Sequence, residues 1–282
     1  MSLSSDLADG ALVPDTPAAA GRRTRWTAGR ITAVAAFVTI AGLIGTWSLA
    51  TALGLVSPVF LPSPASVIAQ FVAVSRSGFV DATLAQHLLA SLGRVFAAIV
   101  AAIAVSVPIG IAIGLSPIGR GVFDPIIEFL RPIPPLAYLT LVIIWFGIGE
   151  TSKVLVIGIA MVAPIVIATA AGVKAVARDR VNAARAFGAT RLQVLRHVVL
   201  PSALPQILTG VRIALGAGWS TLVAAELVAA TRGLGFMIQS AAQFLVTDVV
   251  IMGIVVIAAV AFLLELTIRL VERWLVPWAG KA

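Results

Sequence analysis

The chain has 282 residues, of which 60% are hydrophobic and only 11% are charged, and its formal net charge is +8. So few charged side chains could not cover a soluble domain of this length without large apolar patches, so the composition excludes an ordinary soluble enzyme and indicates an integral membrane protein. Cysteine is absent and there are only two histidines, His87 and His197, so common thiol and metal chemistry has few ligands and we expect no cofactor.

The N-terminal residues 1–30 are predicted to form a disordered cytoplasmic tail, because their first part is rich in Ala, Asp, Ser and Pro without an apolar period. An uncharged run follows from Ile31 to Val56. It is about twice the 7 to 15 residues of a signal-peptide core, which favours a membrane span over a cleaved signal. Arg22 and Arg23 then flank this span on the cytoplasmic side, although a twin-arginine signal is an alternative.

Six apolar stretches approach the roughly 20 residues that a helix needs to cross about 30 Å of hydrocarbon. The predicted spans are 31–56, 95–119, 132–149, 154–173, 213–231 and 249–268. Between the first two spans, several prolines predict a turn, and a partly helical segment is expected on the outer face. The sequence therefore predicts an all-α membrane domain of six helices over residues 31–278, with a short tail at 279–282.

Basic residues favour one orientation, because Lys and Arg are retained on the cytoplasmic side. With the N-terminus inside, only Arg76, Arg94, Lys153 and Arg232 fall on or near the outer side, and the other Lys and Arg residues fall inside. This count assigns Arg120 and Arg131 to the cytoplasmic connection between spans two and three. Both termini are predicted to be cytoplasmic, and the protein is predicted to be a multi-pass protein of the cell membrane.

Two features inside the predicted spans have functional interpretations. Glu226 interrupts the fifth span, and an ionisable group at that depth predicts either a solute contact or a structural partner such as Arg94, Arg131 or a backbone amide. Prolines at and after Pro132, including Pro134, follow Arg131 and break the helix there. Such a break marks a cavity or hinge on the translocation path, or simply the boundary between a loop and a helix.

The cytoplasmic connection 174–206 is the most informative segment. Its pattern predicts one short helix with Val181, Ala184 and Phe187 at helical spacing, and a turn at Gly188. A second helix is predicted to carry Leu192, Leu195 and Val199 on one face and to end near Pro201. Such a hairpin could dock on a partner or lie on anionic lipid.

A spacing pattern in this connection resembles the cytoplasmic "EAA" loop of permease subunits from ABC importers. The pattern is Glu-Ala-Ala, three residues, Gly, nine residues, Ile, one residue, Leu-Pro. The matching positions are Asn182, Ala183, Ala184, Gly188, Val198, Leu200 and Pro201. Asn182 replaces the usual Glu and Val198 the usual Ile, so a carboxylate role at position 182 does not carry over.

Four further stretches are similar to the nitrate, sulfonate and taurine branch of these permeases, and the resemblance covers about residues 56–278. They are the turn at 61–64, FLRPIPPL at 129–136, WFGIG at 145–149 and RGLG at 232–235. The resemblance implies the type I importer permease fold and a coupling helix that fits a groove of a separate ATPase. Ala183, Ala184 and Phe187 would form its apolar docking surface.

The resemblance also implies partners: two ATPase subunits, an extracytoplasmic solute-binding protein, and a second copy of this chain in a homodimer within the lipid bilayer. No stretch matches Gly, four residues, Gly-Lys-Ser/Thr, so energy is expected from a partner, and no nucleic acid partner is expected. The expected cargo is a sulfonate, taurine or nitrate-type solute. A thiamine-precursor-like heterocycle, an ATPase-independent channel or secondary carrier, and a membrane-embedded enzyme are the alternatives.

Overall fold

The computed structural model describes residues 21–278 and divides the chain into two units, residues 1–56 and 57–282. In the first unit, a single long helix, α1 (Gly21–Ala52), contains the first predicted span. It begins before the predicted start at Ile31, so part of the expected tail is helical. The rest of that tail, 1–20, and the expected C-terminal tail, 279–282, lie outside the described residues.

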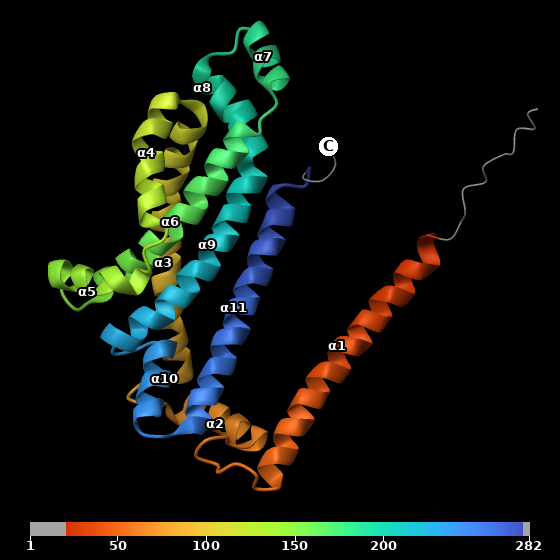
Figure 1. The fold of residues 1–282 in the computed structure, drawn as a ribbon, viewed down its shortest axis with the longest axis vertical. Helices are drawn as coiled ribbons and strands as arrows, with labels where there is room; N and C mark the ends of the chain where they lie inside the picture. The colour runs from red at the N-terminus through yellow and green to blue at the C-terminus, as the bar shows by residue number, and fades with distance from the viewer. Residues whose placement is uncertain (1–20, 279–282) are drawn as a thin grey trace, which may run out of the picture. The chain divides into compact units, whose positions relative to one another are not determined.

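The core of the second unit is built by three long helices: α3 (Leu84–Leu115), α6 (Glu150–Lys174) and α9 (Leu200–Ala229). They pack closely along their length (Figure 1). Small residues permit this approach: a Cβ on Gly110 would lie 2.5 Å from the Thr169 side chain, and one on Gly210 would lie 2.5 Å from Ala168. Membrane helices pack in this way because, without a hydrophobic driving force between them, close backbone approach supplies the contact energy.

The third predicted span, 132–149, begins at a sharp break between two helices. Helix α4 (Pro117–Leu130) and helix α5 (Pro135–Phe146) meet at a bend of 101°. Pro132, Pro134 and Pro135 cannot donate the backbone bonds that would continue α4, so the chain turns at this point. Arg131 therefore lies at this break, between α4 and α5, where the sequence predicted that the prolines interrupt the helix.

The two ends of the second unit carry different structures. At one end, α7 (Arg178–Ala186), α8 (Arg191–Val194) and the π-helical segment η1 (Leu195–Val199) form a hairpin that leads into α9 (Figure 1). At the other end lie α2 (Pro64–Ser77) and α10 (Leu234–Gln243). Helix α11 (Thr247–Leu275) runs back toward the hairpin end. The polar segments are thus gathered at the ends of an apolar bundle.

Five helices of the described range are long and apolar enough to cross a membrane, or up to six if the bent α4–α5 pair forms one span. The all-helical architecture with about six spans is as expected from the sequence. Helix α3 begins at Leu84, well before the predicted Val95, because a capping box at Thr83 and Gln86 starts the helix within a polar segment that an apolar count leaves out.

Candidate functional site

The turn of the hairpin is a helix cap that depends on Gly188. The amide of Gly188 donates to the carbonyl of Arg185 at 2.9 Å, and the amide of Ala189 donates to that of Ala184 at 3.1 Å. These two bonds form a Schellman motif, which requires the left-handed backbone that Gly188 adopts, with φ at +80°. Thr190 and Gln193 then form a capping box that starts α8. Gly188 therefore sets the angle at which the chain reverses.

The apolar residues of the hairpin do not share one face. Val181 and Ala184 pack inward against a cluster that contains Val194 and Val199. Phe187 lies just after α7 and is 93% exposed, so it points outward, contrary to the expectation that it shares a face with Val181 and Ala184. Asn182 and Ala183 are exposed as well. The surface presented to solvent is thus a bulky ring beside two small side chains.

The second helix of the hairpin does not end near Pro201. The amide of Leu200 donates to the carbonyl of Leu195, five residues back, and this wider π turn lets the chain continue into α9. Pro201 then takes a position at the start of α9, where its missing amide costs little. The π turn also changes the buried face: Val194 and Val199, five residues apart, are buried, whereas Leu192 is exposed. A continuous helix therefore links the hairpin to the bundle.

A surface hollow of about 370 Å³ lies in the bend of the hairpin. Phe187, Gly188 and Val198 line it, together with Ala184, Ala189, Gln193 and His197. Of the positions that match the EAA pattern, Ala184, Gly188 and Val198 are thus brought together here. Leu200 and Pro201 lie beyond the hollow, at the start of α9.

At the opposite end of the bundle, Glu226 lies in a buried polar cluster. Its side chain is 1% exposed and accepts hydrogen bonds from Ser91 Oγ at 2.7 Å, Arg94 Nη1 at 2.5 Å and the Gly235 amide at 2.8 Å. Arg94 also holds Glu150 with two bonds, at 2.5 and 2.8 Å. Of the partners suggested by the sequence, the structure pairs Glu226 with Arg94 and with a backbone amide, and not with Arg131.

The RGLG stretch is the turn that this cluster holds. Arg94 Nη1 donates to the carbonyl of Arg232 at 2.8 Å, and the amides of Gly233 and Leu234 donate to His87 Nδ1 and Ser91 Oγ. A Cβ at Gly233 or Gly235 would collide with Glu226. The two glycines therefore leave the space that the Glu226 carboxylate occupies. The hydrogen bonds with Arg94, His87 and Ser91 hold the turn between α9 and α10 against α3.

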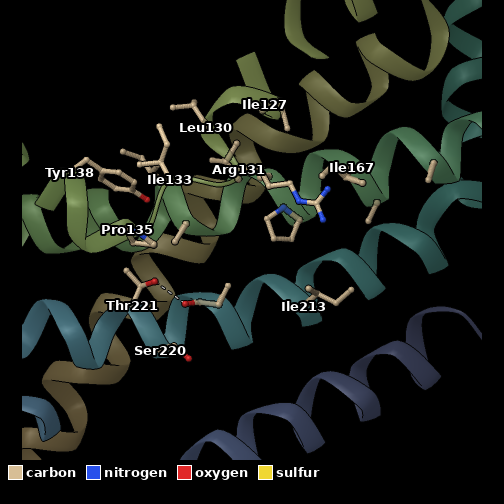
Figure 2. Close-up of a pocket in the computed structure, with 18 residues that line it drawn as sticks. Ile127, Leu130, Arg131, Ile133, Pro135, Tyr138, Ile167, Ile213, Ser220 and Thr221 are labelled. Carbon is tan, nitrogen blue, oxygen red and sulfur yellow. Dashed lines mark hydrogen bonds between the residues drawn. The ribbon is translucent and has the colours of Figure 1, made fainter. Parts of the chain in front are cut away.

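A cavity of about 680 Å³ lies between the α4–α5 break, α6 and α9 (Figure 2), and it opens at the surface of the chain, where Arg131 and Ile213 are exposed. Its walls are mostly apolar, and its polar side chains are Arg131, Tyr138, Ser220 and Thr221. Pro134 belongs to the break but does not line the cavity. Sequence reasoning identified Arg131 but missed the other three, because single hydroxyl groups in an apolar run give no pattern.

Comparison with known proteins identifies the family. Residues 106–277 match the sequence profile of the family described as the binding-protein-dependent transport system inner membrane component. This chain is a member of that family. It is 57% identical, over 86% of its length and 89% of the relative, to the taurine transport system permease protein TauC of Escherichia coli, and 40% identical to the putative aliphatic sulfonates transport permease protein SsuC of the same organism, over 84% and 89%.

The solved structures that it resembles have the same fold. An inward-facing form of the MetNI methionine ABC transporter covers 68% of this chain and 95% of its own, with a TM-score of 0.61 and 21% identity. This permease is therefore a multi-pass inner-membrane subunit of an ABC importer and has the type I importer permease fold, as the sequence predicted. Its role is transport and not enzymatic catalysis, and such permeases work with an ATPase and a binding protein.

Proposed function

We propose that this permease forms a homodimer with two ATPase subunits and a solute-binding protein, and that the complex imports taurine or a closely related small sulfonate. The observation that supports taurine as the solute is the 57% identity to the taurine permease over most of both chains. The identities to the aliphatic sulfonates permease and the bicarbonate permease are 40% and 33%. Lower identities, such as 33% to a bicarbonate permease, support the same kind of complex but a different cargo.

The hairpin around Gly188 is the proposed contact with the ATPase. Phe187 is almost fully exposed beside a hollow that could seat a protruding side chain of a partner, and no residue of the described range covers it. Exposed aromatic residues next to a hollow are typical anchors of protein interfaces.

The continuous helix from α8 through η1 into α9 is the proposed route of mechanical coupling. Helix α9 packs on α3 and α6 and carries Glu226 at its far end. If the ATPase displaces the hairpin, α9 would move with it as a rigid helix. The displacement would therefore reach Glu226 at the opposite end of the bundle. The buried ion pair of Glu226 serves as a structural tie in this scheme, because both of its carboxylate oxygens already accept hydrogen bonds from the protein.

Reconstitution of the complete complex in proteoliposomes tests the proposal. With binding protein outside and ATP inside, we expect radiolabelled taurine to accumulate, and we expect unlabelled taurine to compete better than ethanesulfonate, nitrate or bicarbonate. Accumulation of nitrate or bicarbonate with no taurine uptake would contradict the assigned solute. Uptake that is independent of ATP would contradict the assignment to an ATP-driven importer.

A further inference from the structure

We infer that the cavity at the α4–α5 break is a transient binding site for the solute within the membrane domain, in which Arg131 receives the sulfonate group and the hydroxyl oxygen of Thr221 receives an amine at the other end. The inference rests on the proposed function, because it assumes a sulfonate cargo. It assigns a chemical role to a cavity that the hairpin mechanism does not use.

The depth of the cavity is the first argument. Helix α4 has 14 residues and begins beside the end of α3, so at about 1.5 Å per residue Arg131 lies about 21 Å along it. The lining residues of α9 fall between Ile213 and Thr221, in the middle of that helix, and those of α6 run from Ile159 near its middle to Ala171 in its C-terminal half. A broken helix with a cavity at mid-length is where transporters commonly place their solutes.

The charge of Arg131 is the second argument. Within residues 21–278 its guanidinium has neither an ion pair nor a hydrogen bond, whereas Arg94 and Lys153, the basic groups buried at the α10 end, are both paired with Glu150. Figure 2 shows the Arg131 side chain directed toward the Ile167 and Ile213 side of the cavity. The Arg131 side chain is exposed at the cavity. A cation without a partner at this depth in a membrane is costly, and a bound oxyanion would offset that cost through charge-assisted hydrogen bonds.

The Thr221 hydroxyl provides an acceptor at the other end of the cavity. Ser220 Oγ donates to the carbonyl of Gly216 at 3.2 Å, and Thr221 Oγ1 donates to that of Ala217 at 2.9 Å. Because each hydroxyl group donates its hydrogen bond within α9, its oxygen can still accept one from a ligand. In Figure 2 Thr221 lies on the Pro135 side of α9, away from the Arg131 guanidinium, whereas the Ser220 oxygen lies at the opposite edge of the helix. Donors at one end and an acceptor at the other match a small molecule with a sulfonate and an ammonium group.

The size and walls of the cavity agree with this occupant. A volume of about 680 Å³ exceeds what a molecule with a two-carbon stem fills, so the solute could enter and leave without a tight fit. The apolar walls accept the stem but cannot replace the hydration of its charged ends. We therefore expect weak and short-lived binding, which suits a site on a translocation path.

The absence of cysteine allows a direct test with single-cysteine variants of the full complex in phosphatidylcholine nanodiscs. Ile213→Cys places a thiol on the cavity wall, and Ile148→Cys, in the α5–α6 connection, is the exposed control. Each is labelled with sulfonatoethyl and trimethylammonioethyl methanethiosulfonate, and rates are divided by those for a free thiol. We expect the anionic reagent to be favoured about tenfold at position 213 and not at position 148.

Two further labelling experiments test the role of Arg131 and the identity of the solute. Arg131→Met should remove the anionic preference at position 213, whereas Arg120→Met on the same helix should leave it intact. Taurine at millimolar concentration should slow labelling of Ile213→Cys only when Arg131 is present. An unchanged preference in Arg131→Met, or no protection by taurine, would overturn the inference. Failure of the proposed function is distinguishable, because it would appear as missing ATP-dependent taurine uptake by the wild-type complex whatever the labelling result.

Discussion

Arg94 and Glu226 form an ion pair that joins α3 to α9 across 132 residues of sequence, with 2.5 Å between Nη1 and Oε1 and exposures of 4% and 1%. A pair so deeply buried gains little relative to apolar packing, but removal of one partner leaves the other charge uncompensated. It therefore acts as a lock between two helices, and each partner depends on the other.

Arg94→Ala should lower the free energy of unfolding by about 3–5 kcal/mol, because Glu226 would remain buried without its cation. Thermal unfolding in detergent measures this loss. The double variant Arg94→Ala/Glu226→Gln should recover part of it, since the amide is neutral and can still accept a hydrogen bond. The control is Arg269→Ala, whose pair with Glu265 is exposed and worth about 0–1 kcal/mol. Equal losses at both sites would contradict the lock.

Gly235→Ala should destabilise the turn between α9 and α10. A Cβ at this position would lie 2.8 Å from the carbonyl of Val223 and 2.9 Å from the Glu226 side chain, which forces the turn away from α9. Overpacking of this kind costs about 1–3 kcal/mol. Gly93→Ala, where nothing lies within 4 Å, should instead be neutral or stabilise α3 by up to about 1 kcal/mol. Unfolding curves of the two variants make the comparison, and a neutral Gly235→Ala would refute the tight fit.

Gly188→Val should abolish taurine uptake and uncouple ATP hydrolysis while leaving membrane insertion intact. A β-branched residue disfavours the left-handed backbone at φ +80° by more than the 1–2 kcal/mol or so typical of L-residues, so the hairpin would reopen. Gly188→Asn is the matched control, because Asn adopts this conformation readily. Uptake at the wild-type rate by Gly188→Val would remove the mechanical role of the turn.

Phe187→Ala should weaken ATPase binding without changing the stability of the permease. The ring is 93% exposed, so its removal takes away no internal packing, but an interface anchor of this kind contributes about 2 kcal/mol or more. Co-purification and ATPase titration would report a loss of about 30-fold or more in affinity, since 1.4 kcal/mol corresponds to tenfold. Ile148→Ala, exposed on the connection between α5 and α6, should have no effect. An unaltered ATPase affinity in Phe187→Ala would show that Phe187 is not the anchor of the contact with the ATPase.

The sequence predicted the helical membrane fold because apolar run length depends only on local composition. It also predicted the turn at Gly188, where a single residue type sets the backbone. It could not predict that the helix continues past Pro201, because a π turn shifts the helical register by one residue and leaves no compositional trace.

The functional centres within the bundle were harder to predict, since they depend on contacts between distant segments. Glu226 was recognisable as an ionisable residue in an apolar run, but its choice of Arg94 over Arg131 follows from which helices pack together. The prolines after Arg131 indicated a break with a cavity or hinge, but the residues of α6 and α9 that complete the cavity follow only from the packing of the helices. Tyr138, Ser220 and Thr221 carried no signal of their own.

The central claim is that the hairpin receives work from a separate ATPase and passes it to the bundle. The most direct measurement is taurine uptake by the purified permease in vesicles with binding protein, with and without its ATPase and ATP. The account predicts accumulation only when both ATPase and ATP are present, and none with a non-hydrolysable ATP analogue. Accumulation at the full rate by the permease without its ATPase would contradict it.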